Sequence, residues 1–312
     1  MNYMRRKIIT TLFALAASLC AVLAQHDYWL TMERFSRVGK NPAGIVKNDE
    51  INLFLHGRYQ WAGVDNSPKT LAVSLSDYED KIKSGFGITL SHDVFGVAHS
   101  NTGGKLSYSF QIGMGQGTVL SLGVAAGFHM SRFDFSANIT EEYYEYESAL
   151  YERDKEVMVS PDFDCGAELR TKHWIFGVSS THIQNSEGTT EKGKRHIYTY
   201  GIATYPLNPK LDLSPSICYM HRNKTNVMEV GALLLSKRSL WGGAAWRPDL
   251  NNSANPSPLS FTLGYEWNRF RFGYTYEMGL GSNSHLPSNT HEILLYGHFG
   301  KIVQKNECFD NY

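Results

Sequence analysis

Apolar and polar residues alternate along most of the chain beyond residue 50. This pattern predicts β-strands, because successive side chains of a strand point to opposite faces. One clear run of alternate apolar positions comprises Leu259, Phe261, Leu263, Tyr265 and Trp267. The positions between them are small or polar, namely Ser260, Thr262, Gly264 and Glu266. The same period recurs from segment to segment and predicts an all-β fold.

Fourteen segments follow this period, and most are as long as a tilted strand that crosses a bilayer, about 9–11 residues. We predict strands at 51–61, 69–77, 84–94, 104–113, 118–130, 162–170, 173–183, 194–206, 210–221, 226–237, 240–248, 258–268, 270–279 and 290–300. Their second face is rich in Gly, Ser and Thr, with scattered charges that can form ion pairs. A soluble sandwich would carry more Lys and Glu there. The pattern therefore favours an antiparallel transmembrane β-barrel of about 14 strands in the outer membrane, over residues 51–300.

The predicted connections alternate in length. Short connections lie at 113–117, 171–172, 206–209, 238–239 and 269, and longer ones at 95–103, 131–161, 184–193, 249–257 and 280–289. The connection after the ninth predicted strand is short and interrupts the alternation. Outer-membrane barrels combine short periplasmic turns with long extracellular loops. The alternation thus predicts an even number of strands and both termini in the periplasm.

The N-terminal end predicts a secretory signal peptide over residues 1–24. A basic stretch at 5–7 precedes an apolar run at 8–23, and Ala24 offers a small residue for cleavage. The run is shorter than the ~20 residues of a transmembrane helix. Leu19 before Cys20 does not fit a lipoprotein signal. We expect a periplasmic N-terminal segment at 25–50 and a periplasmic tail at 301–312.

Composition and charge narrow the function classes. Aromatic residues make up 13% of the chain, charged residues 19%, and there are 28 glycines, as expected for strands with a lipid-facing side and aromatic girdles. The formal net charge is zero, so nothing indicates a nucleic-acid partner. Three cysteines follow the predicted signal peptide, Cys165, Cys218 and Cys308, and their odd number and wide spacing exclude a disulfide framework.

The sequence offers no candidate catalytic or metal site. Twelve histidines occur, but none stands in a zinc-binding pattern. The pairs His92–Asp93 and His291–Glu292 are adjacent, so their side chains should face opposite sides of a strand and not one ion. No nucleophile-elbow, phosphate-loop or dinucleotide motif occurs in a suitable context. We therefore predict a protein without enzymatic activity, cofactor or bound metal.

Two segments outside the predicted strands need separate interpretation. Residues 141–156 are acidic and rich in Tyr; we interpret them as a solvated extracellular loop, with a protein contact surface as the alternative. A calcium site is disfavoured because the EF-hand spacing is absent. Near the N-terminus, Trp29 and Phe35 precede a turn-forming stretch, 41–44. That segment either leads into the first strand, plugs the lumen or docks a periplasmic partner.

Several motifs occur in order at the start of the mature chain. They are Asn41-Pro42-Ala43-Gly44, then Arg58-Tyr59-Gln60-Trp61-Ala62-Gly63, then Ser67-Pro68-Lys69-Thr70, Gly85-Phe86-Gly87 and Asp93-Val94-Phe95-Gly96. In order and spacing they resemble the PorP/SprF family. The resemblance implies an outer-membrane barrel of the type IX secretion system of Bacteroidetes, the machinery that also serves gliding motility. It implies two kinds of protein partner besides outer-membrane lipid: periplasmic ring proteins of the PorK/PorN type and the C-terminal domain of a secreted adhesin.

The motif residues supply our candidate partner-binding set, Asn41, Pro42, Gly44, Arg58, Gln60 and Trp61. Arg58 and Gln60 are two positions apart, so both should face the lumen and bind the N-terminal segment or a partner strand. Trp61 at the strand end fits an aromatic girdle. The alternative is that these residues only stabilise the barrel. At the level of function, the alternatives are an outer-membrane porin or fatty-acid-type uptake channel, and an outer-membrane enzyme.

Overall fold

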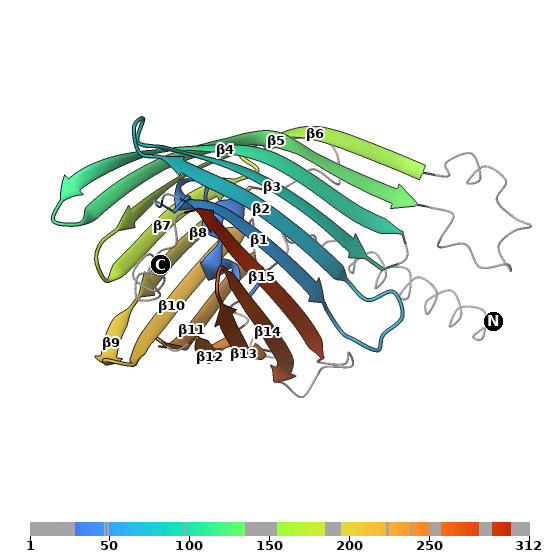
Figure 1. The fold of residues 1–312 in the computed structure, drawn as a ribbon. Helices are drawn as coiled ribbons and strands as arrows, with labels where there is room; N and C mark the ends of the chain where they lie inside the picture. Colours follow the sequence, from blue (N-terminus) through green and yellow to red (C-terminus); the bar gives the residue numbers. More distant parts are fainter. Residues whose placement is uncertain are drawn as a thin grey trace, which may run out of the picture.

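The computed structural model describes most of the predicted barrel and the segment before it. The described residues are 29–46, 48, 50–96, 98–134, 155–184, 195–222, 225–237, 239–248, 250, 257–280 and 289–300. Within these ranges the chain forms β-strands and three short 3₁₀-helices (Figure 1). No helix in this part of the chain is long and apolar enough to span a bilayer.

The helices come first in the chain and the strands follow. The helices are η1 (Glu33–Phe35), η2 (Arg37–Gly39) and η3 (Pro42–Gly44). The strands are β1 (Glu50–Tyr59), β2 (Lys69–Glu79), β3 (Ser84–Phe95), β4 (His99–Gly115), β5 (Thr118–Asp134), β6 (Lys155–Arg170), β7 (Trp174–Thr181), β8 (His196–Ala203), β9 (Tyr205–Asn208), β10 (Leu211–Arg222), β11 (Thr225–Ser236), β12 (Leu240–Trp246), β13 (Ser257–Trp267), β14 (Phe270–Leu280) and β15 (Thr290–Gly300).

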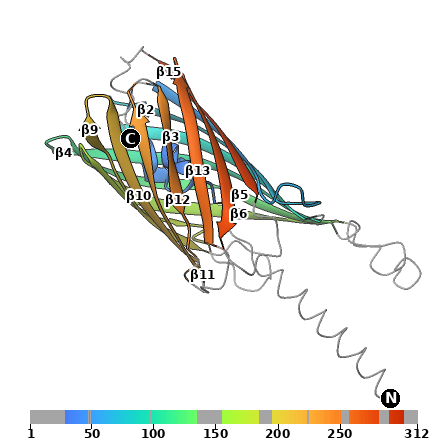
Figure 2. The same ribbon diagram turned by 90° about the horizontal axis from the view of Figure 1, so that it is seen from below.

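Each strand pairs antiparallel with its neighbours, and the sheet closes into a barrel (Figures 1 and 2). The last strand returns to the first, with Glu50 opposite Gly300 and Tyr59 opposite His291. Strands β8 and β9 both pair with β10 and are separated only by Thr204, so they form one interrupted strand of the wall. The wall therefore has 14 strands, which confirms the predicted fold class.

The alternation predicted from the sequence is the alternation of the barrel's two faces. Large apolar side chains lie exposed on the outside, as in Leu71, Phe86, Leu106, Phe176, Leu263 and Tyr274. The intervening side chains are buried inside, as in Ser76, Ser107, Ser179 and Thr275. His92 and His291 point outward while Asp93 and Glu292 point inward, as expected for adjacent residues on a strand.

Several predicted boundaries were wrong. Strand β1 ends at Tyr59, so Gln60 and Trp61 belong to the connection that follows. Strand β4 starts at His99 and not at 104, so the expected long connection at 95–103 is short. Strand β6 starts at Lys155 and not at 162, because its first residues pair with an equally extended β5, with Asp134 opposite Lys155.

The N-terminal segment lies inside the barrel, and both views show it in blue surrounded by strands (Figures 1 and 2). We expected residues 25–50 to form a segment in the periplasm before the first strand; residues 29–46 instead contact inward-facing side chains around the lumen. The predicted signal peptide, the tail at 301–312 and most of the acidic loop, 141–154, fall outside the described residues.

Candidate functional site

The lumen around the N-terminal segment is the candidate functional site, because it gathers two buried ion-pair networks and four of the six predicted binding residues. The segment contacts strands from all round the wall. Hydrogen bonds or ion pairs join it to β1, β2, β4, β6, β7, β8, β10, β11 and β15. Residues 29–46 therefore bridge the lumen from one side to the other.

Asn41 organises the turn that the sequence singled out. Its side-chain oxygen accepts a hydrogen bond from the Ala43 N–H at 2.9 Å and so caps η3. Pro42 follows at the first helical position, where its fixed φ suits a helix. The Asn41 amide also donates to the Ala167 carbonyl at 3.1 Å and to the Tyr200 hydroxyl at 3.0 Å. Asn41 is fully buried, so one side chain both shapes the turn and ties it to β6 and β8.

Glycines make room for this turn in the barrel wall. A Cβ atom placed on Gly123 of β5 would overlap the backbone between Pro42 and Ala43. A Cβ on Gly166 of β6 would overlap the Asn41 side chain. Gly44 serves the same purpose from within the segment, because a Cβ there would lie 2.7 Å from Cβ of Arg37. The wall and the segment thus fit at van der Waals contact.

A buried ion pair fixes the middle of the segment. Arg37 donates from Nε to Glu168 Oε2 at 2.7 Å and from Nη2 to Oε1 at 3.2 Å. Glu168 also accepts from the Tyr200 hydroxyl at 2.5 Å and from Arg170 at 2.8 Å. A buried carboxylate is costly unless several donors satisfy it, and here every partner is a donor.

A second buried network holds the start of the segment. Arg58 bridges Glu292 at 2.6 Å and Glu277 at 2.9 Å, and it donates to the Trp29 carbonyl at 2.7 Å. Glu292 is fully buried and also accepts from the Thr31 N–H at 3.0 Å. The planar guanidinium of Arg58 carries several N–H donors and can therefore bond to both carboxylates and the Trp29 carbonyl at once. Arg58 therefore binds the protein's own N-terminal segment.

Trp29 is embedded in the same network. Its indole N–H donates to Glu229 at 2.7 Å, and Glu229 pairs with Arg247 at 3.0 Å. The Lys40 ammonium lies 4.1 Å from the centroid of the Trp29 ring, a cation–π geometry. Lys40 also pairs with Glu33. These contacts connect both ends of the 3₁₀-helical stretch across the lumen.

An apolar cluster also supports the segment. Met32 and Phe35 of the segment pack against inward-facing apolar side chains of β1, β11, β12 and β15, which are Phe54, Leu233, Leu235, Trp241, Leu294 and Tyr296. The rings of Phe35 and Trp241 lie 4.8 Å apart, centroid to centroid. The lumen thus has its own hydrophobic core, which the N-terminal segment completes.

Burial of the segment shifts the pKa values of two of its side chains. Burial raises the pKa of the Glu33 carboxyl above its usual value, although the Lys40 ammonium opposes the shift. Burial, with the neighbouring Arg37 and Arg271 cations, lowers the pKa of Arg34 to about 10. Arg34 donates to the Ser214 hydroxyl at 2.5 Å and to the Ser214 carbonyl at 3.1 Å. Burial disfavours the charged form of both groups and is the largest cause of both shifts.

Two predicted site residues lie apart from this assembly. The backbone N–H of Gln60 donates a hydrogen bond to the Pro68 carbonyl at 3.0 Å. Trp61 has a positive φ of 54° and donates its backbone N–H to the Thr290 hydroxyl at 3.3 Å. Both shape the connection after β1. The structure therefore brings together Asn41, Pro42, Gly44 and Arg58 at the segment, while Gln60 and Trp61 stay at the rim.

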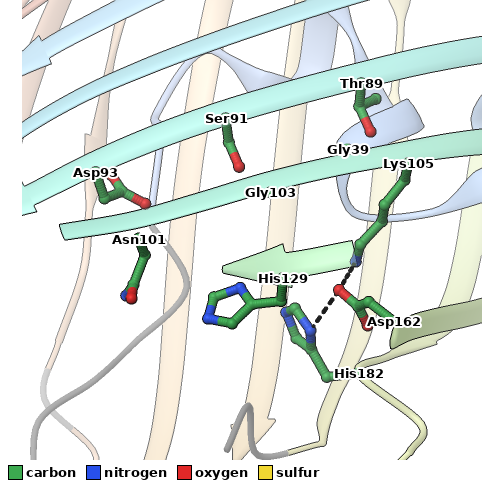
Figure 3. Close-up of a pocket in the computed structure, with 10 residues that line it drawn as sticks. All are labelled: Gly39, Thr89, Ser91, Asp93, Asn101, Gly103, Lys105, His129, Asp162 and His182. Carbon is green, nitrogen blue, oxygen red and sulfur yellow. Dashed lines mark ion pairs between the residues drawn. The ribbon is translucent and has the colours of Figure 1, made fainter. Parts of the chain in front are cut away.

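A polar pocket opens beside η2 and is lined by residues of β3 to β6 and by His182, which follows β7 (Figure 3). Its wall includes Thr89, Ser91, Asp93, Asn101, Lys105, His129, Asp162 and His182. Lys105 pairs with Asp162 at 2.9 Å and with Asp164 at 2.8 Å, and His182 approaches Asp162 at 2.8 Å. Among the described residues no group of three or more His, Cys, Asp or Glu is arranged to hold a metal ion.

Several important residues were not selected from the sequence, among them Arg37, Glu168, Glu277 and Glu292. The glutamates lie at lumen-facing positions of their strands, Glu168 beside Asp164 and Arg170 and Glu292 beside Thr290 and Leu294. A charge on the lumen side of a predicted strand is a usable signal, because a buried charge needs a partner. Which strand supplies the partner residue is decided only when the barrel closes.

Comparisons with known proteins agree with this architecture. Residues 24–296 match the model of the family described as type IX secretion system membrane protein PorP/SprF. A search of curated proteins found no match. Among solved structures, the chain resembles the CymD monoaromatic hydrocarbon channel, with a TM-score of 0.53, 9% identity, and coverage of 85% of this chain and 92% of that one. It also resembles the Pseudomonas putida toluene transporter TodX, with a TM-score of 0.51, 9% identity, and coverage of 89% and 95%.

At 9% identity these two structures establish the fold alone. The family match covers the N-terminal segment and nearly all of the strands that surround it. With a closed wall of 14 strands and an apolar exterior, the molecule is an outer-membrane β-barrel. The chain belongs to the PorP/SprF family of type IX secretion system membrane proteins.

Proposed function

We propose that this barrel is a non-catalytic component of the type IX secretion system, which supports export or surface attachment of cargo proteins and gliding motility. The observation that carries the proposal beyond family membership is the N-terminal segment in the lumen. Buried ion pairs at Arg37 and Arg58 and an apolar cluster at Phe35 hold that segment. A barrel filled in this way is suited to docking other proteins and poorly suited to diffusion of solutes.

The proposal includes an orientation and two partners. Both termini face the periplasm, as the sequence predicts from its connections. Ring proteins of the PorK/PorN type bind on that side. The C-terminal domain of a secreted adhesin binds the barrel during export. Neither partner requires a cofactor, and neither is a nucleic acid.

Deletion of the gene in the native organism tests the export function. We expect a subset of surface proteins to be lost from intact cells and to accumulate in the periplasm, as measured by quantitative mass spectrometry of both fractions. Re-expression of the wild-type chain should restore them. Unchanged surface and secreted proteomes after deletion would contradict the proposal.

Chemical crosslinking in whole cells tests the partners separately. Crosslinks from this barrel to ring lipoproteins are expected on the periplasmic side, and crosslinks to an adhesin only while export proceeds. If the deletion strain loses export but neither kind of crosslink forms in the wild type, the secretion function stands and the proposed partners are wrong.

The alternative function is an outer-membrane uptake channel. Its support is the shared fold with CymD, a monoaromatic hydrocarbon channel, and TodX, a toluene transporter. This function predicts ion currents from the purified barrel in planar bilayers, or slower growth of the deletion strain on a hydrophobic substrate. The secretion proposal predicts neither.

A further inference from the structure

Strand β1 carries a glycine that the fold itself does not require. A Cβ atom placed on Gly57 would meet no atom within 4 Å, and the φ of Gly57 lies outside the left-handed range that favours glycine. By contrast, a Cβ on Gly123 or Gly166 would overlap the N-terminal segment. Glycine within a strand lowers stability and often marks a place where a ligand approaches the backbone closely. Packing within the chain therefore does not explain Gly57.

Gly57 lies on the outer face of the barrel. The residues before and after it, His56 and Arg58, are buried in the lumen, so Gly57 faces the lipid. Its neighbours across the sheet are Leu71 on β2 and Ile293 on β15, and Figure 1 shows these three strands side by side. Leu71 and Ile293 are 50% and 64% exposed. The missing side chain between them leaves an apolar notch, which we call the Gly57 notch.

A polar row borders the Gly57 notch on the side of the long connections. In this row His291 lies opposite Tyr59, and Tyr59 lies opposite Lys69. The three residues stand at or next to the ends of β15, β1 and β2. Tyrosines near strand ends sit at the level of the lipid headgroups. The order from the strand ends toward the middle of the wall is thus polar and then apolar, which is the order of a lipid headgroup and its acyl chains.

Lys69 supplies a cation to this row. Its ammonium lies 5.5 Å from the centroid of the Tyr59 ring, so the side chain leans toward β1. Across the part of the chain that the structure describes, Lys69 forms no ion pair with a carboxylate. The lumen cations Arg37 and Arg58 differ, because each pairs with a buried glutamate. The charge of Lys69 is therefore available to an anion from outside the chain.

His291 supplies a hydrogen-bond donor on the other side of Tyr59. Its Nδ1 lies 2.7 Å from the Tyr274 hydroxyl. When that hydroxyl donates to Nδ1, the neutral ring carries its proton on Nε2. No hydrogen bond joins Nε2 to another of the described residues. Neighbouring strands lie about 4.8 Å apart, so the Cα atoms of Lys69 and His291 are separated by roughly 10 Å, a gap that the two side chains and a phosphate group can span.

We propose that this part of the outer face binds a single lipid whose headgroup carries a phosphate. The phosphate lies between Lys69 and His291, and an acyl chain lies in the Gly57 notch between Leu71 and Ile293. Ammonium groups form strong, charge-assisted hydrogen bonds to phosphate oxygens, and the notch adds apolar contact for the chain. The site is on the lipid-facing wall, so the proposal rests on the barrel fold and not on the secretion function.

Native mass spectrometry of the full-length barrel in detergent tests the site with three probes. Dioleoyl phosphatidic acid carries the phosphate and both acyl chains. Dioleoylglycerol has the same chains without the phosphate, and inorganic phosphate lacks the chains.

Four variants accompany these probes. Lys69→Gln removes the cation, Lys69→Arg keeps it, and Gly57→Leu fills the notch. Lys172→Gln is the matched control, because Lys172 is an exposed lysine in the connection between β6 and β7, at the other end of the wall. Heat-modifiable migration in gels verifies that each variant is folded.

We expect the wild type to bind a single phosphatidic acid molecule, and Lys69→Gln and Gly57→Leu each to bind it more weakly by roughly fivefold or more. Lys69→Arg and Lys172→Gln should bind like the wild type. Dioleoylglycerol should bind the wild type more weakly than phosphatidic acid, and this difference should disappear in Lys69→Gln. Inorganic phosphate at the same concentration should not displace the lipid.

Three results would overturn the proposal. Equal binding of phosphatidic acid by the wild type and Lys69→Gln would exclude Lys69 as the phosphate ligand. Equal binding by the wild type and Gly57→Leu would exclude the notch as the place of the acyl chain. Displacement of the lipid by inorganic phosphate would show that the site recognises a free anion and not a lipid.

Discussion

Arg37 and Glu168 form a buried ion pair that joins the N-terminal segment to strand β6, with two guanidinium nitrogens on the two carboxylate oxygens at 2.7 and 3.2 Å. The two residues are 131 positions apart in the chain. Neither side chain has access to bulk water. Their pairing therefore depends on the segment being inside the barrel, and it can be used to test that location.

Arg37→Met is the first test, because Met keeps much of the length of the side chain and removes the charge. Loss of one partner from a buried pair costs about 3–5 kcal/mol. We expect a drop of that order in the free energy of unfolding, measured by urea denaturation of the barrel refolded in lipid vesicles. The double variant Arg37→Met/Glu168→Gln should recover part of the loss. Additive losses in the double variant would show that the two side chains do not interact.

Gly123→Ala tests the fit between the turn and the wall. The added methyl group would overlap the backbone between Pro42 and Ala43, and overpacking of this kind costs about 1–3 kcal/mol. The matched control is Gly57→Ala on β1, where a Cβ meets no atom within 4 Å. We expect Gly123→Ala to lower the urea midpoint and Gly57→Ala to leave it nearly unchanged. Equal midpoints would place the turn away from β5.

Arg58→Lys separates geometry from charge. Lys keeps the positive charge but cannot bridge Glu292, Glu277 and the Trp29 carbonyl together. We expect a loss of about 2 kcal/mol in the free energy of unfolding, the scale of a charged hydrogen bond. Gln60→Ala, in the same motif but outside the strand, should change it by less than about 0.5 kcal/mol, as at ordinary surface sites. A larger loss of unfolding free energy in Gln60→Ala than in Arg58→Lys would show that Gln60, and not Arg58, stabilises the barrel in this motif.

Deletion of residues 29–46 tests the plugging of the lumen. The wild-type barrel should be silent in planar bilayers. The deletion variant, which lacks the side chains that bridge the lumen, should show stepwise ion currents. Circular dichroism and heat-modifiable migration serve as controls for an intact barrel. Large currents from the wild type would favour the channel function.

The sequence by itself determined which side of most strands faces lipid. Two-residue alternation is local, and the placement of apolar side chains on the outer face and of small polar side chains on the inner face follows from it directly. This is why the run from Leu259 to Trp267 forms strand β13 in the predicted orientation. The order of strands also followed, because consecutive hairpins place neighbours in sequence beside each other. Strand ends were less well predicted, as at His99 and Lys155, because pairing with a long neighbour extends a strand past its own alternation.

Only the tertiary structure decided what fills the lumen. Leu233, Trp241 and Leu294 are inward-facing apolar residues, which a polar lumen does not predict, and they make sense only as the surface that receives Phe35. Arg58 and Glu292 meet because the last strand closes on the first, with these two residues opposite each other. Asn41 reaches Ala167 and Tyr200 because the barrel wraps around the turn. Such contacts join residues more than a hundred positions apart, and local patterns carry no information on which of them meet once the barrel closes.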